Sequence, residues 1–410
     1  MEDLKEQQRK LIGEVTAKNG FLDYEVIAKT VASEGDGYMG NLIGLNIVDR
    51  HSDRKLCLVM KTASDNEKLR RMIPTREMFL REMYYYETVF PELMKFQEKY
   101  HISEPFKSIP PYYGSVKDDR AEAILLGNIK ENQYKMVNRR EPMDGIHLTA
   151  VIKEYARLHA LSFAMHKLEP ELFAKLTEPI KLNVMVEFEM KNQDKGQKSN
   201  LTADSFNTFF EVVFQALEGR DKELAAFRRY AENALQFMFS LFSQPEKCNI
   251  ISHTDCWSTN MLFKYEDESK PDTPTKVCLI DWQLASLSCA VFDIAYFFYI
   301  CAGKEDLHKY KSYLDIYHST LSDRIRDFGL DPLEMYPVEV FEKDWKEYSK
   351  WGIFMTIMML PQSLSEGKTH DFEKMAENGE NIAIRKHKMT DEFKKRIMDL
   401  IEFVVEQDLL

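Results

Sequence analysis

The sequence lacks most of the features that would place it in a specialised class of protein. Its 410 residues include six cysteines, and no two of them form a Cys-x-x-Cys pair, which argues against a zinc site. Scattered cysteines in a long chain are typical of a reducing compartment. A surplus of positive charge is also missing. The formal net charge of −12 argues against a nucleic-acid partner, because phosphate backbones favour a basic surface.

Long apolar runs are missing as well. The most apolar stretch, 284–303, contains Asp293 and several serines and cysteines, whereas a membrane-spanning helix needs about 20 predominantly apolar residues. We therefore expect this stretch to be a buried core helix. The first fifteen residues have neither a basic region nor an apolar one, so we expect no signal peptide, no membrane insertion and a cytoplasmic location.

The chain changes character about a third of the way along. Strands are expected, from alternating or short apolar runs, over 42–48, 54–61, 122–126, 248–252, 261–265 and 276–281. Helices are expected, from apolar spacing, over the first ~20 residues and over 78–95, 147–166 and 206–217. This order predicts an α+β fold with two lobes, a small strand-rich lobe over 1–127 and a larger, mostly helical lobe over 128–410.

The clearest chemical signal is a His-x-Asp-x-x-x-x-Asn motif at 253–260, followed by an apolar strand that ends in Asp281. Phosphoryl transfer requires the protein mainly to position groups and to neutralise charge. Asp255 lies in a loop, where it can accept the proton of an attacking hydroxyl group. Asn260 and Asp281 offer the oxygen ligands that Mg2+ prefers. The motif therefore predicts Asp255 as a catalytic base and Asn260 and Asp281 as metal ligands.

Two apolar segments surround these residues. Segments 261–263 and 277–280 are separated by a polar turn with two prolines, which predicts an antiparallel hairpin. Such a hairpin would hold Asn260 and Asp281 side by side. His253 follows two isoleucines and is expected to support the loop from a buried strand rather than to carry a proton.

Upstream residues offer the parts of a nucleotide site. A glycine-rich turn that includes Gly35 and Gly37 lets backbone amides approach phosphate, although a plain turn has the same composition. Lys61 ends an apolar strand, where a kinase places the lysine that binds the α- and β-phosphates. Glu82, on the next helix, is its candidate ion-pair partner. Each feature alone is weak, and their order along the chain is what favours a kinase.

At this point the sequence resembles the ecdysteroid kinase-like family of arthropods, also called CHK kinase-like, within the aminoglycoside and choline phosphotransferase group. The resemblance is carried by SHTDCWSTNMLFKY, VCLIDWQ and AVFDIAYFF and extends roughly from Gly35 to beyond Tyr299. It implies a protein-kinase-like fold, ATP and Mg2+ as cofactors, and phosphate transfer to a small-molecule alcohol. The implied acceptor is an ecdysteroid or a similar hydrophobic alcohol.

The resemblance also implies roles for particular residues. It assigns the lysine–glutamate pair, the base and the metal ligands to the residues already named. Backbone groups over 125–128, including Leu126 and Asn128, match the segment that connects the lobes and takes the adenine base. Asp293 is implied to anchor the catalytic loop, and helix capping is the alternative for this residue.

The sequence departs from the family pattern at several positions. Thr254 stands where the family usually has glycine, and Trp282 where it often has phenylalanine. A protein kinase is excluded, because Trp282 and Gln283 replace Phe-Gly and no Ala-Pro-Glu follows. Two alternatives stay open: a choline or aminoglycoside kinase, and a catalytically weak protein that binds nucleotide or hormone. No acceptor-binding residue and no protein partner is indicated.

Overall fold

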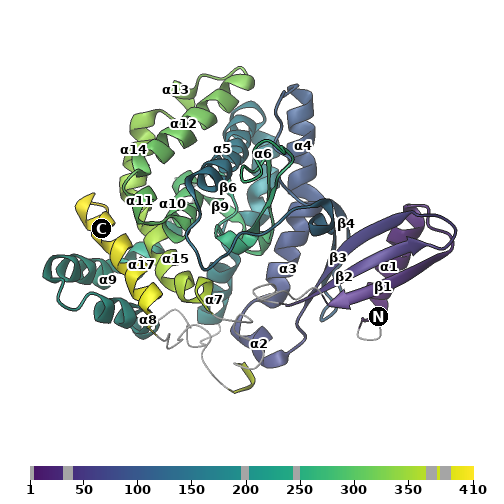
Figure 1. Cartoon of the computed structure of the whole chain (residues 1–410), viewed down its shortest axis with the longest axis horizontal. Helices are drawn as coiled ribbons and strands as arrows, with labels where there is room; N and C mark the ends of the chain where they lie inside the picture. Colours follow the sequence, from purple (N-terminus) through teal and green to yellow (C-terminus); the bar gives the residue numbers. More distant parts are fainter. Residues whose placement is uncertain (1–3, 31–39, 195–202, 243–249, 366–375, 379–388) are drawn as a thin grey trace.

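The computed structural model describes residues 4–30, 40–194, 203–242, 250–365, 376–378 and 389–410. Figure 1 shows a strand-rich part on the right and a larger helical body on the left. The described part of the chain includes no helix that is both long and apolar enough to cross a membrane. The α+β class and the two-part organisation predicted from the sequence are therefore confirmed.

The strand-rich part is a five-stranded antiparallel sheet in the order β1-β2-β3-β5-β4. Its strands are β1 (Tyr24–Thr30), β2 (Gly40–Asp49), β3 (Lys55–Ala63), β4 (Tyr112–Val116) and β5 (Ala123–Gly127). Helix α1 (Glu6–Lys18) packs against the sheet, and its buried apolar side chains join those of the strands in one cluster. The sheet ends at Gly127, and the division of the chain into lobes at that residue stays a prediction.

A long helical segment with a wide turn follows β3. It consists of α2 (Glu67–Met72), α3 (Thr75–Tyr84), a π-helical turn (Tyr85–Val89) and α4 (Phe90–Lys99). Pro91 has no amide hydrogen and its ring crowds the carbonyl four residues earlier, so an α-helical turn is unfavourable here. The amide of Phe90 instead donates to the carbonyl of Tyr85, five residues back.

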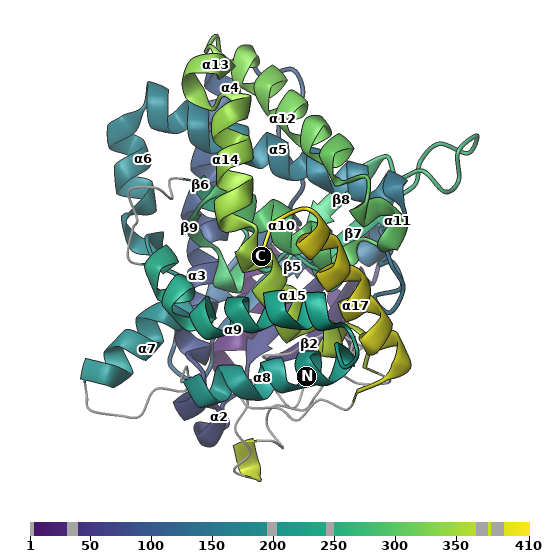
Figure 2. The same ribbon diagram turned by 90° about the vertical axis from the view of Figure 1, so that its left-hand side faces the viewer.

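The helical body is built from most of the remaining elements. Its helices are α5 (Gly145–Leu168), α6 (Pro170–Thr177), α7 (Val184–Asp194), α8 (Ala203–Ala216), α9 (Asp221–Phe242), α10 (Ala290–Cys301), α11 (Lys304–Leu307), α12 (Tyr310–Asp327), α13 (Pro332–Met335), α14 (Val338–Tyr348), α15 (Lys350–Ser363) and α17 (Asp391–Glu406). Short 3-10 turns lie at Ile129–Asn132, Glu178–Ile180, Ser258–Asn260 and Trp282–Leu284. In Figure 2, α8, α9, α15 and α17 form one contacting group.

Two short antiparallel strand pairs position the motif residues within this body. They are β6 (Ile250–Ser252) with β9 (Ser286–Ser288), and β7 (Met261–Lys264) with β8 (Lys276–Leu279). Helix α10 contacts β6, and every one of its residues is buried. The expected buried core helix over the most apolar stretch is thus confirmed, and so is the hairpin formed by β7 and β8.

Candidate active site

Lys61, near the end of β3, makes two ion pairs with residues that are distant in the sequence. Its Nζ lies 2.8 Å from Glu82 Oε2 and 2.8 Å from Asp281 Oδ1. The lysine side chain is 12% exposed. Burial alone would lower the pKa of Lys61, but the two carboxylates outweigh it and raise the pKa. The lysine is therefore held as a cation.

Glu82 links the sheet to the segment that follows β8. Its side chain is 1% exposed, and its second oxygen accepts a hydrogen bond from the amide of Trp282. The indole of Trp282 packs on Tyr85 and Phe90 of the same helical segment. The lysine–glutamate pair predicted from the sequence is present, and the helix that carries it also supports the second half of the site.

The β7–β8 hairpin brings Asn260 and Asp281 together. Met261 pairs with Leu279, and the amide of Ile280 donates to the carbonyl of Asn260 at 3.0 Å. Asn260 therefore stands just before one strand and Asp281 just after the other. Asp281 has a φ of 65°, in the left-handed region that aspartate tolerates better than most residues.

Asp255 and Asn260 are bonded directly to each other. Asn260 Nδ2 donates to the Oδ2 of Asp255 at 2.8 Å and to its backbone carbonyl at 3.0 Å. Burial and the nearby carboxylate of Asp281 raise the pKa of Asp255 to about 7. Two carboxylates and one amide thus share a small region that is only partly open to solvent, with the side chain of Asp281 29% exposed.

His253 supports the loop, as predicted. Its Nε2 donates to the carbonyl of Ile280 at 2.8 Å, and its Nδ1 accepts from the amide of Asp255 at 3.2 Å. The ring packs against Trp282, with centroids 4.4 Å apart. Burial lowers the pKa of His253, which favours the neutral ring that these two bonds require.

Asp293 of α10 anchors the loop from below. Its carboxylate is fully buried and accepts the amide hydrogens of His253 and Thr254, each at 2.8 Å. It also contacts His159 Nε2 at 3.2 Å. Burial alone would raise the pKa of Asp293, but His159 and the loop amide outweigh it and lower the pKa. The anchoring role is the one observed; Asp293 does not cap its helix, which begins after Cys289.

Of the residues predicted to contact the nucleotide, the structure describes Leu126 and Asn128 but not the two glycines. Gly35 and Gly37 lie outside the described residues. Leu126 is in β5, opposite Val59. The amide of Asn128 already donates to Cys57 on β3 at 2.9 Å, and that of Gly127 donates to Pro111 at 2.8 Å. An adenine base at this segment would therefore meet its carbonyl oxygens rather than these two amides.

Sequence reasoning missed the buried groups that fix the Glu82 helix to the sheet. Glu122, just before β5, is fully buried and pairs with Arg70 and with Arg76, the latter at 2.8 Å. The carboxylate of Glu87, in the π-helical turn, accepts the hydroxyl hydrogens of Tyr112 and Ser115. No local pattern marks these residues, because each pair is at least 25 positions apart.

The donor chemistry fits a magnesium ion. The candidate ligands are a carboxylate of Asp281 and the amide oxygen of Asn260, whose nitrogen is directed at Asp255. Mg2+ prefers such oxygen donors and takes only one or two from the protein when phosphate and water complete its shell. The described residues contain no group of three or more His, Cys, Asp or Glu side chains suited to a metal ion.

Comparison with known proteins places this geometry in a family. Two solved structures resemble the chain weakly: the aminoglycoside phosphotransferase APH(2'')-Ib with ADP bound and a glucosamine kinase. Each has a TM-score of 0.35 and 11% identity over 97% of this chain, covering 98% and 83% of the other chain respectively. Similarity this weak supports no conclusion about the activity of this chain. No curated protein sequence matches the chain.

The family comparison is decisive. The sequence pattern of the Ecdysteroid kinase-like family matches residues 34–330, which include every motif residue discussed above. This match supports a small-molecule phosphotransferase with a protein-kinase-like fold. Because it spans well over half of the 410 residues, the chain belongs to the ecdysteroid kinase-like family.

Proposed function

We propose that this protein transfers the γ-phosphate of MgATP to a hydroxyl group of a small molecule. The observation that carries the proposal is the double contact of Lys61 with Glu82 and Asp281, both at 2.8 Å. Through these two contacts the Lys61 cation connects the sheet to helix α3 and to the segment that contains Asp281. The bonded pair of Asp255 and Asn260 lies on the loop that is fastened to the same segment.

Each residue has a distinct task in this proposal. Lys61 binds the nucleotide phosphates, and Glu82 holds the lysine in place. Asn260 and Asp281 would hold the metal ion, which when bound neutralises charge on the phosphates. Asp281 contacts Lys61 directly, so the phosphate-binding cation and the metal ligand are positioned by one interaction.

Asp255 is the group that receives the proton of the acceptor hydroxyl. The side-chain amide of Asn260 donates a hydrogen bond to this carboxylate and so orients it on the loop. A desolvated carboxylate with a raised pKa is a stronger base than an exposed one, which suits proton removal near neutral pH. The proton moves to a carboxylate oxygen of Asp255 as the hydroxyl oxygen bonds to the γ-phosphorus, and the bond from that phosphorus to the bridging oxygen breaks so that ADP leaves.

The acceptor we propose is an ecdysteroid or a similar hydrophobic alcohol, which follows from the description of the family. A choline or aminoglycoside acceptor is the alternative that shares the same chemistry. A protein that binds nucleotide with little catalysis is opposed by the presence of the lysine, the base and both metal ligands. A cytoplasmic location, expected from the scattered cysteines, is part of the proposal.

A transfer assay tests the function and the acceptor together. The wild-type protein and the Asp255→Asn variant are incubated with ATP labelled in the γ-phosphate and with ecdysteroids, other hydrophobic alcohols, choline or aminoglycosides. We expect labelled steroid with the wild type and none with the variant. Labelling of choline or an aminoglycoside alone would select the alternative acceptor, and no labelled acceptor together with no ATP hydrolysis would refute the function.

A further inference from the structure

Thr254 adopts a backbone conformation that threonine rarely takes. Its φ is 63°, in the left-handed region, where a β-branched side chain is strongly disfavoured. The residue is 5% exposed and lies directly before Asp255. A conformation of this kind persists only where the surrounding contacts impose it.

Two contacts impose it, one from the backbone and one from the side chain. The amide of Thr254 donates to Asp293 at 2.8 Å. The hydroxyl Oγ1 donates to the carbonyl of Leu284 at 2.7 Å. Asn183 donates to the same carbonyl at 3.0 Å, so Leu284 is a junction of three segments. A glycine would accept this φ without cost but would lose the hydroxyl contact.

The hydroxyl contact completes a pair of ties around Asp281. On one side His253 Nε2 bonds to the carbonyl of Ile280, and on the other Thr254 Oγ1 bonds to the carbonyl of Leu284. Two consecutive loop residues thus hold the chain before and after Asp281. His253 is part of the recognised motif. The left-handed backbone at residue 254 would suit glycine, so the backbone conformation does not by itself explain the threonine side chain.

We infer that Thr254 is a positioning residue that sets the separation between Asp255 and Asp281. The inference rests on the proposed function, in which these carboxylates serve as base and metal ligand. Loss of the hydroxyl frees one side of the metal-ligand segment while the loop keeps its anchor on Asp293. Misplacement of reacting groups by about 1 Å is enough to reduce a rate 100-fold.

Three substitutions separate the hydroxyl from the backbone strain. Thr254→Ser keeps the hydroxyl, Thr254→Val keeps the branched shape without it, and Thr254→Gly removes both the strain and the contact. We expect kcat to fall about 10- to 100-fold in the valine and glycine variants, with KM for ATP within about twofold. The serine variant should recover most of the activity. Thermal unfolding identifies any variant that fails to fold, and the glycine and serine variants alone still decide the question.

Thr259→Val is the matched control. Thr259 lies in the same loop and is 5% exposed, and among the described residues its hydroxyl has no hydrogen-bond partner. The same chemical change there should leave kcat within about twofold, because the hydroxyl that is removed makes no hydrogen bond. A drop equal to that of Thr254→Val would refute a specific role for the Thr254 hydroxyl.

Hydrogen exchange gives a second readout that does not depend on catalysis. In Thr254→Gly the amides of 282–286 should exchange faster than in the wild type, while those of α10 keep their rates. Unchanged exchange and unchanged kcat would overturn the inference, and faster exchange with unchanged kcat would overturn the positioning role. If the wild type transfers no phosphate, the proposed function fails, and the exchange measurement alone then decides whether the tie exists.

Discussion

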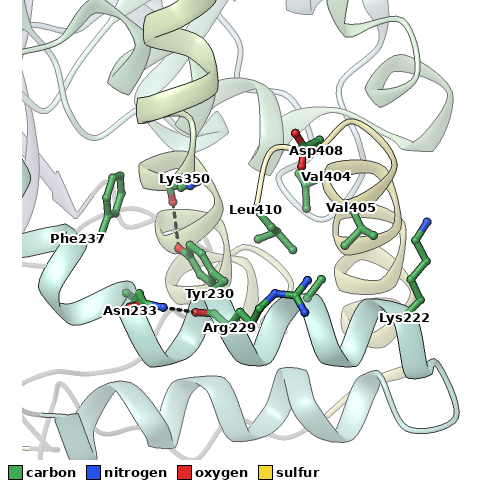
Figure 3. A pocket seen from close by; sticks show the side chains of 12 residues that line it. Lys222, Arg229, Tyr230, Asn233, Phe237, Lys350, Val404, Val405, Asp408 and Leu410 are labelled. Carbon is green, nitrogen blue, oxygen red and sulfur yellow. Dashed lines mark hydrogen bonds between the residues drawn. The ribbon is translucent and has the colours of Figure 1, made fainter.

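Two regions of the protein contain several charged side chains, and they differ in how those charges are held. In the candidate active site, charged groups from distant segments are buried or half-buried and bonded to one another. The second region is a cavity of about 490 Å3 between α9, α15 and α17 (Figure 3). It is lined by Lys222, Ala226, Arg229, Tyr230, Asn233, Ala234, Phe237, Lys350, Val404, Val405, Asp408 and Leu410.

The charges around the cavity are mostly exposed. Lys222, Arg229 and Asp408 lie at the surface, and the carboxylate of Asp408 pairs with Lys346 while remaining 86% exposed. The hydrogen bonds drawn in Figure 3 run to backbone carbonyls, from Tyr230 to Lys350 and from Asn233 to Arg229. The comparison teaches that volume alone does not indicate chemistry. Charges that converge from separate segments beside the motif are the better indication, because burying a charge is costly unless it is paired and because shifted pKa values gather at functional sites.

The largest effect is expected at the proposed base. Asp255→Asn keeps the shape of the side chain but removes the proton acceptor. Phosphate transfer should fall by about 10²- to 10⁴-fold, while MgATP still raises the melting temperature. Steady-state kinetics and thermal unfolding measure the two quantities. Wild-type turnover in this variant would show that the Asp255 carboxylate is not the base.

Asp281→Asn tests the metal-ligand role without disturbing the backbone. Asparagine tolerates the left-handed φ of 65° that alanine would strain. At 100 times Kd, MgATP would stabilise the wild type by about 2.7 kcal/mol, and most of this gain should vanish in the variant. Stabilisation by ATP without magnesium is the control. An undiminished magnesium-dependent shift would contradict the assignment.

Glu122→Gln tests a buried charge that lies outside the candidate site and that we expect to stabilise only the fold. Removal of the partner of Arg70 and Arg76 should cost about 1–3 kcal/mol at pH 7. Burial alone would raise the pKa of Glu122, but the two arginines outweigh it and hold the pKa below its usual 4.5. The charge therefore stabilises the fold above pH 4.5, and this contribution is lost as the pH falls through the lowered pKa.

Denaturant unfolding at several pH values measures this prediction. The stability gap between wild type and Glu122→Gln should be full at pH 7 and should narrow steadily below the usual pKa of 4.5. A gap that is independent of pH would mean that the carboxylate charge is not what holds the helix to the sheet. Lys117→Met, which removes a cation that is 56% exposed and pairs with Glu87, is the control and should change stability by no more than about 1 kcal/mol.

The smallest effect is expected at the cavity. Arg229→Ala should change the free energy of unfolding by less than about 0.5 kcal/mol and should leave phosphate transfer within about twofold. The same assays as for Asp255→Asn apply. A tenfold loss of transfer would break the comparison, because it would give the exposed region a catalytic role.

Much of the fold was predictable where the sequence signal is local. Strands β2, β3 and β5, helix α5 and the β7–β8 hairpin follow from apolar spacing and turn residues within short windows. Strands β1, β4 and β9 were missed. The last is three residues long, and β4 contains Gly114 and an irregular register, so neither shows a clear alternation. Short strands depend on their partners, which no single window reveals.

The candidate site divides in the same way. Asp255, Asn260 and Asp281 were predictable because the motif and the strand that follows it lie within 30 residues. The bond between Lys61 and Asp281 joins residues 220 positions apart, so only the fold shows it. The left-handed φ of Thr254 was also hidden, although the family's usual glycine at this position was a hint.

The π-helical turn also limits how the chain length can vary. Glu82 faces Lys61 and Glu87 faces β4, although residues five apart lie well away from each other around an ideal α-helix. Deletion of one residue from 83–86 would leave the two glutamates four apart, which is one face of an ordinary α-helix. Insertion of one residue there would leave them six apart and would turn one of them away from the sheet. Insertions should therefore be tolerated in the turn between β7 and β8 but excluded from this helix.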